Sequence, residues 1–452
     1  MAGSDPVSSA AAYPAYLYLQ SAQELLEKQA GSTADRPRSI AGNIMSGGMR
    51  ILLIGYGDRW RKLRKALHSH LQSQSAKSYE NIQERAAKRV VSDIIASPKG
   101  HQDHVKTYAA TIVINIAYGR TDKVSYTDSD IQLVNQCGDR LGQTLRPGSF
   151  KMEALPWLRY VPGYTNTIDQ WHKDELTLFR GQLDMARERL VGNLFVTHRA
   201  RRLTSAFHRT SERLFCFLLY PIHQRKAERS SGQSIDCQIT SAPIFAVVFS
   251  ASAINIVIMA AAVFPEAQRR VQAELDEVIG RDRLPTFDDS DDLPVTWAFI
   301  RESYRWRPVS SGGFQHRTTE DIAWKGFFIP AGTPILGNHW GIHRDPTYYP
   351  NPESFDIDRW LIKNDTGSYQ LNKDIKHFQF GFGRRVCPGQ HIADRSVFIN
   401  TSNLLWAFDV AESKDKPIDT LAFTNAANSH PLPYEARFTP RFDGVAEVCF
   451  EN

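Results

Sequence analysis

The sequence lacks the features that mark several common classes of protein. Its five cysteines are odd in number and scattered, so they match neither a zinc-binding spacing nor a disulfide framework. The net charge is only +5, and no basic stripe with interleaved aromatic residues is present, which argues against a nucleic-acid-binding protein. The first thirty residues hold no apolar run like that of a secretory signal. We therefore expect a globular protein of a reducing compartment, with no nucleic-acid partner.

One long stretch of the chain, residues 244–264, carries no charge. Its length alone makes it a candidate for a membrane-spanning helix. The run continues past Pro265 into a charged, amphipathic pattern over residues 266–279, which favours a long buried helix that crosses the core. We prefer the buried helix.

Residues 196–240 differ from the rest of the chain. They are rich in arginine, histidine and serine, and their hydrophobic periodicity is weak. A surface segment and an error in the gene model both remain open for this stretch.

A single cysteine stands between a glycine-rich basic turn and an apolar run in residues 377–390. Pro388 suits the first position of a helix, which would place Cys387 at a helix N-terminus. There the helix dipole would lower the thiol pKa and make a thiolate available as a metal ligand. The alternatives are a buried, inert cysteine and a dinucleotide-binding glycine loop, but the third glycine of such a loop is here Val386.

The pattern Phe380-x-x-Gly383-x-Arg385-x-Cys387-x-Gly389 resembles, at every position, the haem-binding signature of the cytochrome P-450 family. The resemblance implies that Cys387 is the axial thiolate ligand of haem iron. It also implies that Arg385 pairs with a haem propionate, that Phe380 packs beside the sulfur, and that Gly383 and Gly389 shape the loop around it. A thiolate ligand favours cleavage of the O–O bond.

Two further motifs are consistent with haem propionate contacts. Asp58 can cap a helix on which Trp60 and Arg64 share one face, so that an indole N–H and a guanidinium can hold one carboxylate. In the resembled family this pair contacts a propionate. The resemblance implies a further propionate contact for His316, for which a surface-loop histidine is the alternative.

Three charged residues form a predicted network behind the haem. Glu302 and Arg305 are three residues apart on a predicted helix, which places carboxylate and guanidinium together. The segment 355–360, which contains Arg359, resembles the meander of the same family. The implied trio of Glu302, Arg305 and Arg359 would be structural rather than catalytic.

The resemblance breaks in the predicted central helix. Members of the family usually carry an acid followed by a threonine there, and these groups relay protons to oxygen. Counted back from Pro265, those positions hold Val248 and Phe249. Ser250 follows, and we name it as the candidate proton relay, although a one-residue offset turns a helical side chain by about 100°.

The fold implied by the resemblance is mainly α with a small β region, as one domain over residues 1–452. The implied function is a monooxygenase that inserts one oxygen atom from O2 into an apolar small molecule, with electrons from NADPH through a reductase. The pattern looks most like fungal members of secondary metabolism. The break leaves two alternatives: a haem-binding relative with impaired oxygen activation, and a relay-independent enzyme that uses peroxide or isomerises its substrate.

Most eukaryotic members begin with a membrane anchor that this sequence does not show. The resemblance implies the cytoplasmic face of the endoplasmic reticulum. We accordingly expect either a truncated chain or a protein that is held less firmly or is soluble, with peripheral membrane contact.

Overall fold

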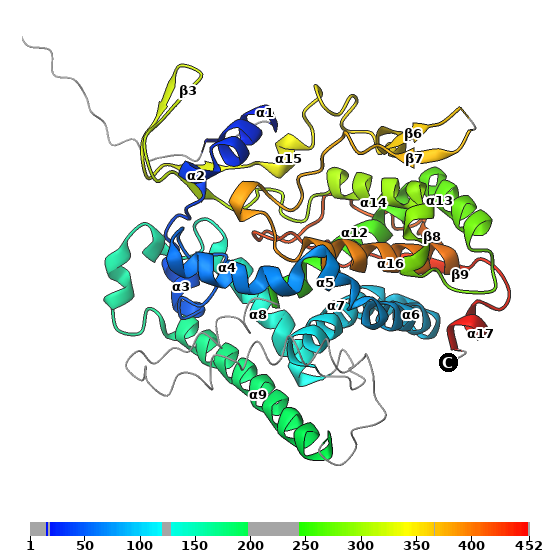
Figure 1. Cartoon of the computed structure of the whole chain (residues 1–452), viewed down its shortest axis with the longest axis horizontal. Coiled ribbons are helices and arrows are strands. Elements are labelled where there is room, and N and C mark those ends of the chain that lie inside the picture. The colour runs from blue at the N-terminus through cyan, green and yellow to red at the C-terminus, as the bar shows by residue number, and fades with distance from the viewer. Residues whose placement is uncertain (1–14, 17–18, 120–127, 198–243, 366, 451–452) are drawn as a thin grey trace, which may run out of the picture.

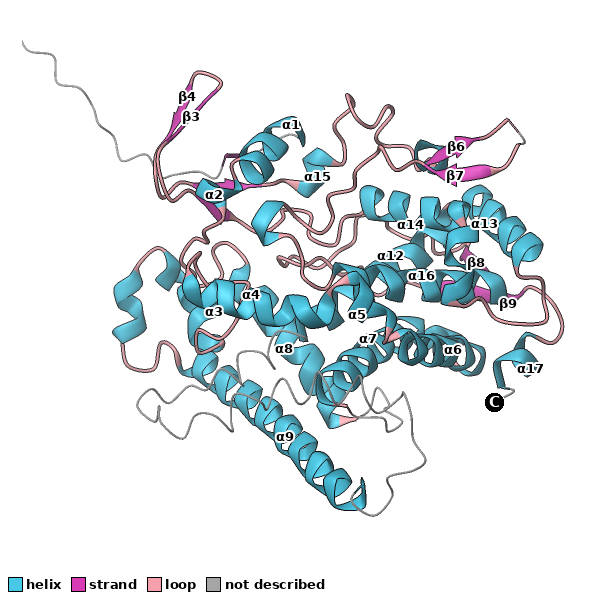
Figure 2. Ribbon diagram, viewed as in Figure 1, coloured by secondary structure: helices cyan, strands magenta, loops and turns pink. Residues whose placement is uncertain are grey.

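The computed structural model describes residues 15–16, 19–119, 128–197, 244–365 and 367–450. The atypical segment 196–240 therefore lies almost wholly outside the described residues. Helices make up most of the described chain, and the strands are few and short (Figure 2). This is the mainly α fold with a small β region that the sequence predicted.

Helices of different lengths form the body of the molecule (Figure 1). The α-helices and the π-helical turn η1 are α1 (Leu19–Ala22), η1 (Gln23–Lys28), α2 (Ala30–Thr33), α3 (Ile40–Met45), α4 (Asp58–Leu71), α5 (Ser73–Lys77), α6 (Glu80–Ala96), α7 (His101–Tyr118), α8 (Ser129–Leu145), α9 (Asn166–Thr197), α12 (Ile244–Val263), α13 (Pro265–Val278), α14 (Pro294–Trp306), α15 (His339–Ile342), α16 (Gln390–Ala407) and α17 (Val445–Phe450). The short 3₁₀ turns are η2 (Pro98–Gly100), η3 (Lys151–Glu153), η4 (Pro156–Tyr160), η5 (Phe287–Asp292), η6 (Ile357–Trp360) and η7 (Gly383–Arg385).

In the described ranges of the chain, the strands form four small sheets. They are β1 (Ala15–Tyr16), β2 (His316–Arg317), β3 (Ile322–Trp324), β4 (Phe327–Ile329), β5 (Pro334–Leu336), β6 (Leu361–Lys363), β7 (Tyr369–Leu371), β8 (Phe408–Glu412) and β9 (Ala436–Pro440). Strand β5 lies between β1, to which it is parallel, and β2, to which it is antiparallel. The other pairs, β3–β4, β6–β7 and β8–β9, are antiparallel.

Helix α12 crosses the core, as the uncharged stretch predicted. Every residue from Ser250 to Ala262 is buried, and the helix packs against α7, α8 and α16. Within the described part of the chain, no single helix is long and apolar enough to span a membrane, although α12 and α13 pass that test together as a pair bent by 105°. The bend falls at Phe264, because Pro265 cannot continue the hydrogen-bond ladder of α12.

Candidate functional site

The loop that carries Cys387 is closed by its own backbone. The Cys387 N–H donates to the Phe380 carbonyl at 2.9 Å, and the turn between them includes Gly383 in the left-handed region, with φ of +51°. A Cβ at Gly383 would collide with the Leu26 carbonyl oxygen of η1. Only glycine therefore fits the place where this loop touches the N-terminal helices.

The helix after Cys387 begins later than the sequence predicted. Pro388 lies in a turn, and α16 begins at Gln390 with Gly389 at its N-cap. Burial raises the pKa of the Cys387 thiol, while the Gly389 N–H and the Arg64 charge lower it by less. The expectation of a lowered pKa is therefore wrong for the protein atoms alone, because desolvation of the sulfur outweighs these two favourable contacts.

Arg385 and Trp60 come together from distant parts of the sequence. The Arg385 guanidinium carbon lies 4.5 Å from the centre of the Trp60 ring. The same guanidinium donates to the carbonyls of Ala34 at 2.6 Å and Ile54 at 2.9 Å. These contacts fix a buried cation within the loop region that includes Cys387.

Trp60 and Arg64 share one face of α4, as predicted, and Arg64 acts electrostatically on Cys387. The predicted capping role of Asp58 is wrong: Gly57 occupies the N-cap, and the Asp58 carboxylate, in the first turn, pairs with Arg61 at 2.5 Å. Among the described residues, neither the Trp60 indole N–H nor the Arg64 guanidinium has a hydrogen-bond partner. Within the part of the chain that the structure describes, both donors thus remain available to a further acceptor.

Arg36 joins this group of cations, and the sequence analysis did not identify it. Its side chain is 9% exposed and donates to the carbonyls of Leu52, Phe314 and Gln315. Burial and the Arg385 charge lower its pKa to about 9. Arg36 therefore adds a second buried positive charge beside Arg385.

His316 lies in the same region, on β2. Its ring is 5% exposed, and Nδ1 lies 3.0 Å from the Thr33 carbonyl, which can only accept a hydrogen bond. The neutral ring would therefore have Nε2 as an acceptor, and contact with a carboxylate would require the imidazolium. Burial and the charges of Arg36 and Arg385 lower the pKa of His316 well below its ordinary value. A bound anion would instead raise the pKa of His316.

The predicted ion network is present in the structure. Arg305 binds the Glu302 carboxylate with two hydrogen bonds, at 2.8 and 2.7 Å, and Arg359 approaches it at 3.4 Å. The Trp360 indole and the Asp356 backbone N–H also donate to this carboxylate. Glu302 and Arg305 are at most 1% exposed. The network joins α14 to η6 and the loop before it.

The residues at the break in the family pattern lie on α12. The Phe249 ring makes an edge contact with Phe314, at 6.1 Å between ring centres. Ser250 is buried, and its hydroxyl has no hydrogen-bond partner among the described residues. The hydroxyl of Ser252 instead contacts His430 Nδ1 at 2.5 Å. Within the described part of the chain, no group is therefore hydrogen-bonded to Ser250 that could supply it with a proton.

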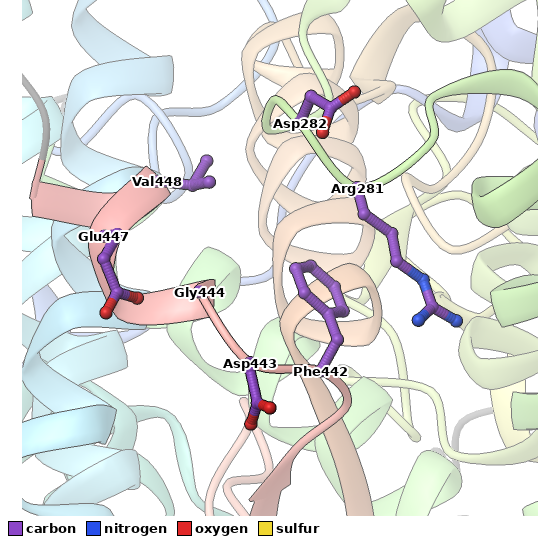
Figure 3. A pocket seen from close by; sticks show the side chains of 7 residues that line it. All are labelled: Arg281, Asp282, Phe442, Asp443, Gly444, Glu447 and Val448. Atoms are coloured by element: carbon purple, nitrogen blue, oxygen red, sulfur yellow. The ribbon is translucent and has the colours of Figure 1, made fainter.

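A surface pocket of about 440 Å³ lies elsewhere, where the loop after α13 faces the segment that leads into α17 (Figure 3). Its lining is mostly polar and charged. It is formed by Arg281, Asp282, Phe442, Asp443, Gly444, Glu447 and Val448. None of the residues predicted for the site lines this pocket, so it is separate from the region around Cys387.

The donor set around Cys387 fits an iron porphyrin with two carboxylates. Arg36, Arg64 and Arg385 bring three positive charges together, whereas Asp35, the carboxylate that acts on Arg36 and Arg385, pairs with Arg317. A cysteine sulfur close to a surplus of cations is consistent with haem held through a thiolate.

Comparison with known proteins indicates the same class of protein. The family model described as cytochrome P-450 matches residues 15–438. Cytochrome P-450 monooxygenases 88 and 64 of Postia placenta are 45% and 44% identical to the chain, and each match covers 93% of the chain and 81% of the relative. A cytochrome P-450 monooxygenase of Armillaria gallica is 32% identical, over 94% of the chain and 81% of that relative. The chain belongs to the cytochrome P-450 family. Membership implies haem bound through a cysteine thiolate.

Proposed function

We propose that this protein is a haem-thiolate monooxygenase in which Cys387 binds the iron. Trp60, Arg64, Arg385 and His316 would hold the two propionates. The observation that carries the proposal is the pair of donors on α4, the Trp60 indole and the Arg64 guanidinium, which have no hydrogen-bond partner within the described residues. A propionate between them would satisfy both donors and offset the charge surplus.

The chain's own residues would hold and orient the cofactor. When bound, the haem supplies the redox chemistry of oxygen activation. The Cys387 sulfur receives a hydrogen bond from the Gly389 N–H, and Arg64 favours its anionic form. Gly383 lets the cysteine loop lie directly against η1, and the Glu302 network fixes α14 behind it. Buried α12 would exclude water from one side of the site.

We further propose an apolar small molecule as the substrate, O2 as the source of the inserted oxygen, and NADPH as the electron source through a flavoprotein reductase. The matched relatives named above are fungal monooxygenases, which supports this reaction class. Because Val248 and Phe249 replace the usual acid and alcohol, a relay-independent reaction with peroxide is the second candidate. The Phe249 ring against Phe314 favours it, because this contact offers no proton donor.

Reconstitution with a reductase distinguishes the two candidates. The monooxygenase predicts NADPH-dependent O2 consumption with one oxygen atom from O2 in the product. The relay-independent enzyme predicts product from peroxide and little coupling of NADPH oxidation to product. Under the second candidate, the double variant Val248→Asp with Phe249→Thr should raise coupling. If NADPH oxidation is strongly coupled to product formation in the wild type, and the substitutions do not change this, loss of the proton relay is excluded.

We also propose a position at the cytoplasmic face of the endoplasmic reticulum, with peripheral membrane contact. Exposed aromatic side chains on η4 and β4 support the contact. Trp157 and Tyr160 in η4 are 59% and 72% exposed, and Phe327 and Phe328 in β4 are 67% and 68% exposed. Flotation with phospholipid vesicles tests this. The variant Phe327→Ser with Phe328→Ser should bind vesicles less than wild type, and equal binding would argue against contact through β4.

A further inference from the structure

The carboxyl group of Asp394 lies near the loop that carries Cys387, and the proposed function assigns it no role. Asp394 lies on α16, seven residues after Cys387, and its Oδ1 is 3.5 Å from the Tyr304 hydroxyl of α14. The Tyr304 ring, which is 4% exposed, makes an edge contact with the Phe380 ring at 6.2 Å. The Phe380 carbonyl in turn accepts the Cys387 N–H. A contiguous set of contacts therefore links Asp394 to the predicted iron ligand.

The charge of Asp394 is poorly compensated. Among the described residues it forms no ion pair within 4 Å. Arg301 and Arg395 attract it from a distance, while Arg395 itself pairs with Glu80 at 2.9 Å. Burial accordingly raises the pKa of Asp394 to about 7.

The sulfur of Cys387 thus lies in two opposing fields. Arg64 on α4 stabilises its anionic form, and Asp394 on α16 destabilises it. The charged and titratable groups that act on Asp394 are Tyr304 and Arg301 of α14, Arg395 of its own helix, and Cys387. The Asp394 carboxylate therefore makes the thiolate form of Cys387 less favourable.

We propose that Asp394 is a positioning residue that sets the reduction potential of the haem held by Cys387. The inference rests on the proposed function, because it requires haem bound to that sulfur. A negative charge that acts on the sulfur ligand disfavours addition of an electron to the iron, so the ionised carboxylate would hold the potential down. Removal of the charge would make the iron easier to reduce. The driving force for electron transfer from the reductase would then increase.

Spectroelectrochemical titration of the haem-loaded protein tests the proposal, at a pH well above the Asp394 pKa of about 7. Asp394→Asn removes the charge at nearly constant size, and Asp394→Glu keeps it. The control is Asp415→Asn, which removes an exposed carboxylate in the turn after β8. We expect a more positive potential for Asp394→Asn and nearly wild-type potentials for the other two variants. Equal potentials in all four proteins would overturn the proposal.

If Asp394→Asn does not bind haem, a second variant still tests the proposal. At the same high pH, Tyr304→Phe keeps the ionised carboxylate but removes the hydroxyl that donates to it, so the potential should become more negative. An unchanged potential in Tyr304→Phe would count against the proposal. The two proposals fail separately. A wild-type protein without thiolate-bound haem would contradict the proposed function, whereas thiolate-bound haem with a potential insensitive to Asp394 would contradict only this inference.

Discussion

Arg64 is the side chain whose surroundings say most about the site. It is a partly buried cation whose guanidinium has no carboxylate or hydrogen-bond partner among the described residues. Arg64→Gln should weaken haem binding by roughly 10- to 150-fold, the equivalent of a charged hydrogen bond worth about 1.5–3 kcal/mol. Haem transfer to apomyoglobin measures this loss.

The control for Arg64 lies on the same helix. Arg61 is 53% exposed and pairs with Asp58, so Arg61→Gln should retain haem like the wild type. If both variants lose haem equally, or neither does, Arg64 is not a propionate ligand.

Two glycines in the loop that carries Cys387 allow a second comparison of a variant with its control. Both have positive φ, but a Cβ at Gly383 would strike Leu26, whereas a Cβ at Gly381 meets nothing within 4 Å. Gly381→Ala should cost only the left-handed conformation, about 1–2 kcal/mol. Gly383→Ala should cost more and also loosen haem, as thermal unfolding and haem absorbance would show. Equal effects would mean that the contact with η1 does not matter.

Local motifs were predictable at this scale because they lie within a few residues of one another. The Cys387 signature and the Trp60–Arg64 spacing needed no tertiary information. Arg36 could not be found in this way, since the carbonyls that hold it belong to Leu52, Phe314 and Gln315, far apart in the chain. No short pattern in the sequence marks it.

At the scale of elements, the Glu302 network holds α14 against the segment around η6. Glu302→Gln would leave the buried guanidinium of Arg305 without its counter-charge. We expect a loss of roughly 3–5 kcal/mol in the free energy of unfolding. Glu266→Gln, at a carboxylate that is 85% exposed, should change it by less than about 0.5 kcal/mol. Urea unfolding of the two variants decides this, and similar losses in both would contradict the structural role.

The sequence predicted the long elements better than the short ones. The uncharged stretch gave α12 correctly, because a run of twenty uncharged, mostly apolar residues is expected either in a buried core or in a membrane. The start of α16 was placed two residues too early, since Pro388 suits a turn as well as a first helical position. The two interpretations of segment 196–240 stay predictions, because residues 198–243 lie outside the described residues.

At the scale of the whole molecule, buried histidines should make the protein sensitive to acid. His101 is 1% exposed between the rings of Tyr434 and Phe438, and burial lowers its pKa to about 4. Its neutral form stabilises the fold above the unfolded pKa of about 6.5, and this stability is lost as pH falls toward about 4.

His101→Phe keeps the ring contacts and removes the titration. Between pH 7 and 5, wild type should lose roughly 2 kcal/mol more stability than this variant. Urea unfolding at the two pH values measures the difference. Equal losses would show that His101 is not the acid-sensitive group.

The central claim is that the Cys387 sulfur is the ligand of a haem iron, and the absorption spectrum of the reduced protein with carbon monoxide tests it most directly. Wild type should show the Soret band of thiolate-bound haem, and Cys387→Ala should lose it, while Cys137→Ala, at a buried cysteine outside the site, should keep it. A wild-type protein that binds no haem, or a Cys387→Ala protein with an unchanged band, would contradict the account.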